Sequence, residues 1–231
     1  LCAAVGGGAA STVALARGER FRFSAEIERI IIDVGVHLHT EFEARLLRDP
    51  AALVIGFEPL PQLFHAAQAR ALRVLPASVS QRLVIVPAAI GLRSGGALEE
   101  AFEAAVEGWV GSLNVAGDPS TGESWYDQAC SSLMAPNSQA GGPELGPSGD
   151  DETTEQRIRR TCSQVALVQE VLVLPLSAVL RRVPPGIRVE LVKVDAQGHD
   201  LAVVESGGRW RPGGGGGGAG RAVGGGRAAA R

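Results

Sequence analysis

The chain has 231 residues, of which 45% are hydrophobic, and its formal net charge is −3 at pH 7. This length and apolar content are enough for one α/β domain with a buried core. Five arginines lie after residue 207, so the body of the chain is clearly acidic. An acidic body in which only 4% of residues are aromatic lacks the charge and the stacking surfaces of a specific nucleic-acid site.

The three cysteines of the chain are Cys2, Cys130 and Cys162. Because their number is odd and their spacing is wide, they indicate neither a disulfide framework nor a zinc site, and they favour a reducing compartment such as the cytoplasm. The apolar stretch 165–180 is interrupted by two polar residues and a proline, so we expect no membrane span. Residues 1–24 lack the basic leader of a signal peptide and are expected to form an N-terminal extension.

The first predicted strand is the apolar run Ile30–Val34, which carries Asp33 near its end. Thr40 and Glu43 have the spacing of a capping box, in which each side chain bonds the backbone N–H of the other residue. This spacing predicts a helix over 41–49, which stops before a proline.

A second buried strand, Leu53–Phe57, ends at Glu58. Pro61 suits the first position of a helix and predicts one that continues over 62–72. A third, shorter strand is Leu83–Val86. Strands that alternate with helices over short connections predict the parallel, right-handed units of a Rossmann-like, three-layer α/β sandwich.

The second half of the chain begins less regularly. Residues 138–156 are rich in Ser, Gly, Pro and acids, which predicts a flexible excursion. Order returns with a strand, a short helix, a further strand and a helical turn, at 165–174, 177–182, 189–194 and 199–205. The last of these strands ends at Asp195.

From residue 207 onward the chain is almost wholly Gly, Arg and Ala, with a six-glycine run over 213–218. Such a segment cannot offset its ordering entropy by burying apolar surface. We therefore expect an α/β domain over 25–206 and a disordered tail over 207–231.

Two acidic residues, Asp33 and Glu58, are predicted to lie at the carboxyl ends of neighbouring parallel strands, where α/β proteins bind their ligands. They are about 25 residues apart, which is near the separation expected of the acid that accepts hydrogen bonds from a ribose. The structural alternative is a pair of carboxylates at tight turns. A dinucleotide needs further glycines in the first loop, so NAD and FAD are disfavoured by what stands there, namely Val36, His37, Leu38 and His39.

Five short motifs stand in a recognisable order and approximate spacing. They are Asp33-Val34-Gly35, Gly56-Phe57-Glu58-Pro59, Pro87–Gly91, Cys130–Leu133 and Leu191–Leu201. Together they resemble the FkbM-type S-adenosylmethionine-dependent methyltransferases over about residues 30–207, and the last motif is the most specific of the five. The resemblance implies a class I methyltransferase sheet and the transfer of a methyl group, commonly to a hydroxyl oxygen.

The resemblance also implies which residues contact S-adenosylmethionine. Glu58 would accept hydrogen bonds from the ribose hydroxyls, and Asp195 would lie beside the transferred methyl group. From the methionine end of the cofactor to its adenine, the set that the resemblance implies is Asp33, Gly35, Glu58, Ala88, Ala89 and Ile90. His37 is a further cofactor-binding candidate by its position in the first loop, where members of the family usually carry small residues and this chain has His37 and His39.

Three residues near the last strand are candidates for catalysis. Lys193, the only lysine of the chain, lies two residues before Asp195, so both side chains are predicted on one face of the strand end. An active-site role and a structural ion pair are both open for this pair. His199 is a candidate general base, with a surface or capping histidine as the alternative. No cluster of Cys, His and acids has zinc spacing, so no metal site is predicted.

The class I sheet continues for three more strands after the one that ends at Asp195, whereas this chain runs into Gly and Arg. We therefore expect a sheet that is truncated after its fourth core strand. The predicted function is methylation of an oxygen of a small molecule or sugar. The alternative is a non-catalytic, truncated Rossmann-like module that binds a nucleoside or a partner, and a nicotinamide-dependent oxidoreductase is disfavoured. The oligomeric state is not predicted.

Overall fold

The computed structural model describes residues 20–92, 108–116, 131–133, 162 and 165–208, together with the backbone of 2–3, 13–14 and 221–224. The predicted excursion over 138–156 lies outside these residues. Near the N-terminus, β1 (Cys2–Ala3) and β2 (Val13–Ala14) form a short antiparallel pair. The remainder of the described chain is a mixed α/β structure.

The centre of the fold is a five-stranded, parallel sheet with the order β10-β9-β3-β4-β5. Its strands are β3 (Arg29–Val34), β4 (Ala52–Phe57), β5 (Leu83–Val86), β9 (Arg188–Val194) and β10 (Arg221–Gly224). The four strands that the sequence predicts for this sheet are confirmed. The first strand in the chain that joins the sheet, β3, is also its central one, so later strands are added on both sides, as in Rossmann-like folds.

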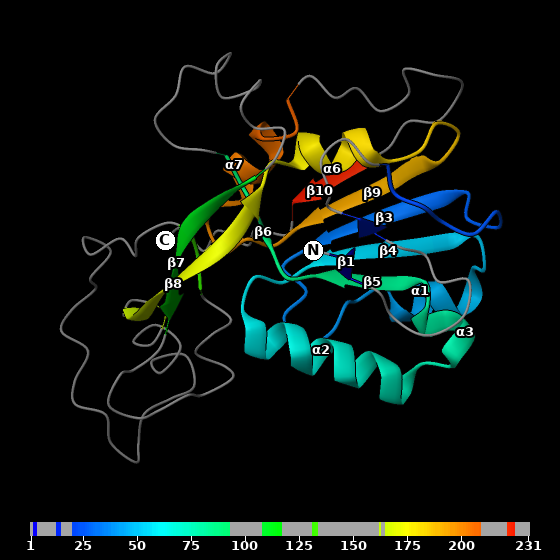
Figure 1. The fold of residues 1–231 in the computed structure, drawn as a ribbon, viewed down its shortest axis with the longest axis horizontal. Helices are drawn as coiled ribbons and strands as arrows, with labels where there is room; N and C mark the ends of the chain where they lie inside the picture. The colour runs from blue at the N-terminus through cyan, green and yellow to red at the C-terminus, as the bar shows by residue number, and fades with distance from the viewer. Residues whose placement is uncertain are drawn as a thin grey trace.

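Helices cover both faces of this sheet, which makes three layers (Figure 1). One face buries Ile30, Ile32 and Ile55 against α6 (Leu176–Arg182) and α7 (Asp200–Glu205). The alternate residues of the same strands point the other way, against α1 (Glu43–Arg48), α2 (Pro61–Val74) and α3 (Ala77–Ser80). Because both faces are covered, the strands are continuous apolar runs and not alternating ones.

The four predicted helices, now α1, α2, α6 and α7, begin and end within two residues of their predicted bounds, and Pro61 is the first residue of α2. The short helix α3 was not predicted. The capping box predicted for α1 is wrong, because no side chain caps the start of this helix. The Thr40 hydroxyl instead donates to Asp33 Oδ2, at 2.5 Å, and the Glu43 carboxylate pairs with Arg70. The Thr40 oxygen also accepts the backbone N–H of Phe42, the residue before the helix, and no N–H within it, and the charged pair with Arg70 is stronger than a bond from Glu43 to a backbone N–H.

The strand β10 corrects two expectations about the end of the chain. Residues 221–224, which were expected to be disordered, pair in parallel with residues 191–194 of β9. The sheet therefore has a fifth strand and does not stop at the fourth. A four-residue strand flanked by glycines has no apolar run by which the sequence could predict it. Its identification as a strand depends on its pairing with β9. Residues 209–220 and 225–231 lie outside the described part of the chain.

A second sheet lies beside the carboxyl ends of the first (Figure 1). It has the order β6-β8-β7 and consists of β6 (Ala89–Ile90), β7 (Trp109–Ala116) and β8 (Val165–Leu174). β6 follows directly on β5 and pairs in parallel with β8, which pairs antiparallel with β7. Its inner face packs on Leu60 and Leu63, so this sheet forms a wall above the strand ends.

Two further observations bear on the expectations from composition. No helix in the described part of the chain is long and apolar enough to cross a membrane.

Cys162 is disulfide-bonded, which is contrary to the expectation that the cysteines form no disulfide. The sequence gives no spacing rule that pairs cysteines far apart in the chain, which is why this bond was not foreseen.

Candidate functional site

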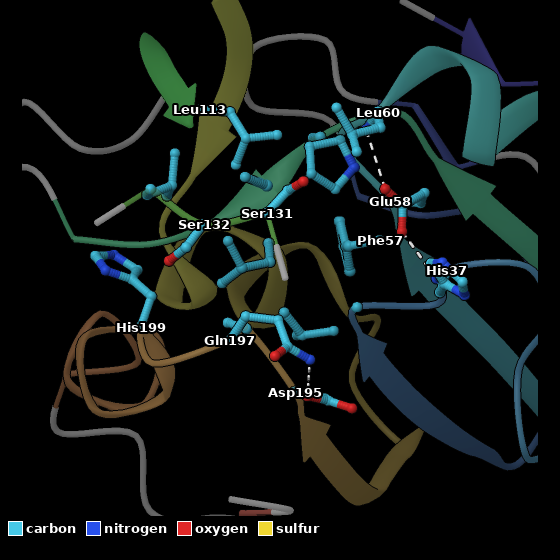
Figure 2. A pocket seen from close by; sticks show the side chains of 18 of the residues that line it. His37, Phe57, Glu58, Leu60, Leu113, Ser131, Ser132, Asp195, Gln197 and His199 are labelled. Atoms are coloured by element: carbon cyan, nitrogen blue, oxygen red, sulfur yellow. Dashed lines mark hydrogen bonds between the residues drawn. The ribbon is translucent and has the colours of Figure 1, made fainter. Parts of the chain in front are cut away.

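A cavity of about 220 Å³ lies at the carboxyl ends of β3, β4 and β9, under the second sheet (Figure 2). This is the edge at which open α/β sheets bind their ligands. Its volume is just below the ~300–1,000 Å³ usual for small-molecule sites. Most of its lining is apolar. The polar side chains that line it are two carboxylates, three ring or amide groups and two hydroxyls, namely Glu58, Asp195, His37, Gln197, His199, Ser131 and Ser132.

Glu58 is the buried carboxylate of the cavity, and its residue is only 4% exposed. Its Oε2 accepts a hydrogen bond from the backbone N–H of His37, at 2.8 Å, and its Oε1 accepts one from that of Leu60, at 3.0 Å. Within the described residues no lysine or arginine is ion-paired with it. Burial therefore outweighs these two hydrogen bonds and raises the pKa of Glu58 from 4.5 to about 7.

The turn after β3 brings two strand ends into contact. Gly35 has a φ of +84°, and a Cβ at this position would collide with the backbone oxygen of Asp195. Only glycine combines this conformation with so close an approach. The same turn is also bonded to the end of β4, because His37, at φ +55°, donates its backbone N–H to the Glu58 carboxylate. Gly35 and His37, two of the candidate cofactor-binding residues, both line the cavity.

Asp33 is placed differently from Glu58. It is 1% exposed and is not among the residues that line the cavity. Its Oδ1 lies 3.2 Å from Lys193 Nζ, and its Oδ2 accepts the hydroxyl of Thr40. Burial raises the pKa of Asp33, and the Lys193 ammonium opposes this rise. Asp33 therefore places no side-chain atom in the cavity, where the predicted contact with a cofactor would be made.

The segment after β9 forms the floor of the cavity. Asp195 has a side chain that is 45% exposed, and its Oδ1 accepts a hydrogen bond from Gln197 Nε2, at 2.9 Å. Gln197 has a φ of +50°, in the left-handed region that side chains other than glycine rarely adopt. Asp200 fixes this turn, since its Oδ1 accepts the backbone N–H of Ala196, at 2.7 Å. Non-glycine residues in this region often mark functional sites.

His199 lies at the other end of the cavity from Glu58, near Ser132 (Figure 2). Both of its ring nitrogens are buried, and neither has a hydrogen-bond partner within the described residues. Burial lowers the pKa of His199, and the nearby Asp200 carboxylate only partly opposes this shift. The imidazole is therefore held neutral, which is the form that can accept a proton.

The remaining predicted residues also have clear positions. Ala88, Ala89 and Ile90 line the cavity beside Glu58, whereas Lys193 does not line it. Sequence reasoning missed the apolar wall that α2 and β7 contribute through Leu60, Leu63 and Leu113. Leu113 reaches the strand ends only through the pairing of β7 with β8, which no local motif marks. No three His, Cys, Asp or Glu side chains of the described residues are grouped so as to hold a metal ion.

A parallel sheet with helices on both faces and an acidic residue in the cavity at its strand ends defines a Rossmann-like α/β protein. A family model described as the methyltransferase FkbM domain matches residues 33–216, which is most of the chain. The chain belongs to this family. Comparisons with curated proteins and with solved structures gave no significant match.

Proposed function

We propose that this protein binds S-adenosylmethionine in the cavity and transfers its methyl group to a hydroxyl oxygen of a small molecule or sugar. Membership of the FkbM family supports methyl transfer as the class of reaction. The single observation that carries the proposal is the position of Glu58, a buried carboxylate that faces the cavity at the end of β4 without a lysine or arginine partner in the described chain.

The residues around the cavity fit this cofactor at three points. Glu58 has unused acceptor capacity on both oxygens, which suits the two hydroxyls of a ribose. Ala88, Ala89 and Ile90 offer an apolar border for an adenine. The half-exposed carboxylate of Asp195 gives a negative potential, which favours a cationic sulfonium group.

S-adenosylmethionine, when bound, supplies an electrophilic methyl group on a positively charged sulfur. The acceptor hydroxyl must lose its proton as its oxygen forms the new bond, so a base is needed at that end of the cavity. His199 meets this requirement, because its ring nitrogens have no hydrogen-bond partner among the described residues and lie at the end of the cavity opposite Glu58 (Figure 2). Gln197 would hold the Asp195 carboxylate in place through the hydrogen bond to its Oδ1.

Calorimetric titration with S-adenosylmethionine and S-adenosylhomocysteine tests the proposal. We expect micromolar binding by the wild type. Glu58→Ala removes at least one hydrogen bond to a charged group, which contributes about 1.5–3 kcal/mol, so its affinity should fall by at least roughly 10- to 100-fold. Glu190→Ala is the matched control, because Glu190 is a carboxylate of the same sheet that pairs with Arg45 and does not line the cavity.

Two results would contradict the proposal. A cooperatively folded wild type that binds neither compound would favour a non-catalytic module. Equal loss of affinity in Glu58→Ala and Glu190→Ala would show that the effect is one of general stability and not of ribose recognition.

A further inference from the structure

We propose that Asp33 and Lys193 act as positioning residues, which hold the Gly35 turn against the end of β9 and so set the shape of the cofactor cavity without contacting the cofactor. This inference rests on the proposed function, because it assigns a role at the same site. It replaces the direct cofactor contact and the catalytic role that the sequence suggested for these two residues.

The contacts of Lys193 carry the inference. Its Nζ donates to the backbone oxygen of Gly35, at 3.2 Å, and lies 3.2 Å from Asp33 Oδ1. The same Nζ is 3.7 Å from Asp195 Oδ2. One ammonium group therefore contacts Gly35 in the turn after β3, Asp33 within β3 and Asp195 directly after β9.

The sheet brings these groups together. Asp33 and Lys193 are directly paired residues of the neighbouring strands β3 and β9. Both precede the point at which the strands leave the sheet, and Gly35 and Asp195, which come directly after it, both line the cavity. A shift of the ammonium would therefore move two cavity walls at once.

Asp33 is fixed on its other side as well. The Thr40 hydroxyl donates to its Oδ2, and the same hydroxyl oxygen accepts the backbone N–H of Phe42, at 3.2 Å. The loop that leads from Gly35 to α1 is thus tied back to β3. Asp33 Oδ1 lies 3.2 Å from the Lys193 ammonium without forming a hydrogen bond to it, and because the residue is 1% exposed and does not line the cavity, a ligand there does not reach its carboxylate.

A purely structural ion pair is a weak explanation for these residues. Burying two opposite charges often gives no net gain in stability over an apolar pair of the same shape. The other residues of β3 and β4 that face α1 and α2 are apolar, such as Ile31 and Val54. The hydrogen bond from Lys193 to the backbone oxygen of Gly35 accounts for a charged pair at this one position in the sheet.

The test separates positioning from stability. Lys193→Met alone leaves the Asp33 carboxylate buried and unpaired, so the informative variant is Asp33→Asn with Lys193→Met, which removes both charges. We expect this double variant to unfold cooperatively within a few degrees of the wild type and yet to bind S-adenosylhomocysteine about tenfold or more weakly, since small misplacements of binding groups cost large factors. Arg45→Met, which breaks the pair between α1 and Glu190 of β9, is the control and should bind as the wild type does.

Hydrogen exchange without ligand gives a second readout. We expect faster exchange in residues 33–40 of the double variant and unchanged exchange in residues 83–90. Wild-type affinity together with wild-type exchange in the double variant would overturn the inference. A folded wild type that binds no S-adenosylhomocysteine would contradict the proposed function, and unchanged exchange in residues 33–40 would then overturn the positioning role by itself.

Discussion

The ends of β3 and β4 each carry one buried acid, and the two acids differ in what surrounds them. Asp33 is 1% exposed, lies beside an ammonium group and faces away from the cavity. Glu58 is 4% exposed and lines the cavity, and among the residues that the structure describes its carboxylate accepts hydrogen bonds only from backbone N–H groups. Neighbouring strands thus deliver the same functional group into opposite environments.

This difference shows how a binding carboxylate can be told from a structural one. A buried charge that the protein has already paired has little to gain from a ligand, whereas a buried charge without a counter-ion is stabilised by any donor that reaches it. We therefore infer that Glu58 is the residue available to a ligand and that Asp33 shapes the site. The changes described next test this contrast, beginning with the largest expected effect.

Removal of the ammonium group should affect Asp33 most. Lys193→Met leaves a carboxylate that is 1% exposed without its counter-ion, and breaking a buried pair in this way costs about 3–5 kcal/mol. We expect a large drop in the free energy of unfolding, measured with urea. The additional change Asp33→Asn should restore most of it, and a failure to do so would show that the pair is not coupled.

Glu58 should make stability depend on pH in a definite direction. Its pKa of about 7 in the folded protein exceeds the ordinary 4.5, so the folded state holds the proton more tightly than the unfolded state. The penalty for the buried carboxylate is absent below pH 4.5, grows as the pH rises and is complete above about pH 7, where it reaches roughly 3 kcal/mol. Relative to Glu58→Gln, the wild type should lose stability across this window in urea unfolding at several pH values. Parallel curves for the two proteins would show that Glu58 is not buried as a charge.

Two glycines with positive φ distinguish the packed turn after β3 from the open one after β9. Gly35, at +84°, would place a Cβ on the Asp195 backbone oxygen, whereas Gly198, at +90°, has nothing within 4 Å of a Cβ. We expect Gly198→Ala to cost only the conformational penalty of about 1–2 kcal/mol, and Gly35→Ala to cost more and also to weaken S-adenosylhomocysteine binding. Calorimetry and thermal unfolding check both. Equal effects would mean that the two strand ends do not touch.

The smallest effect concerns His199. Burial lowers its pKa below the ordinary 6.5, so the folded protein resists protonation more than the unfolded chain does. Its contribution to the free energy of unfolding is therefore complete above pH 6.5 and declines as the pH falls below that value, opposite in direction to that of Glu58. NMR titration of the ring, assigned with His199→Gln, should give a midpoint below 6.5. A midpoint above 6.5 would contradict the neutral base proposed for the acceptor.

Much of the central sheet could be predicted, because fully buried parallel strands are continuous apolar runs that a sequence displays directly. Ile30–Val34 and Leu83–Val86 are examples, and Pro61 marked the start of α2 correctly. Residues 221–224 could not be predicted, since their strand has no apolar run and depends on pairing with β9. The capping box failed for a related reason, because Glu43 pairs with Arg70 of another helix, a contact that local sequence does not show.

The candidate site was predictable where a residue follows a strand and unpredictable where a partner comes from another strand. Glu58, Gly35 and Asp195 follow strands, and all three line the cavity. The pairing of Asp33 with Lys193 depends on β9 lying next to β3, an order that local sequence does not contain. The same holds for the wall that the second sheet contributes.

A crystal structure of the complex with S-adenosylhomocysteine is the most direct test of the central claim. We expect the ribose hydroxyls within hydrogen-bond distance of the Glu58 carboxylate, with Asp33 still paired to Lys193. A ligand whose ribose is bound by Asp33, or one that lies outside the cavity, would contradict the account.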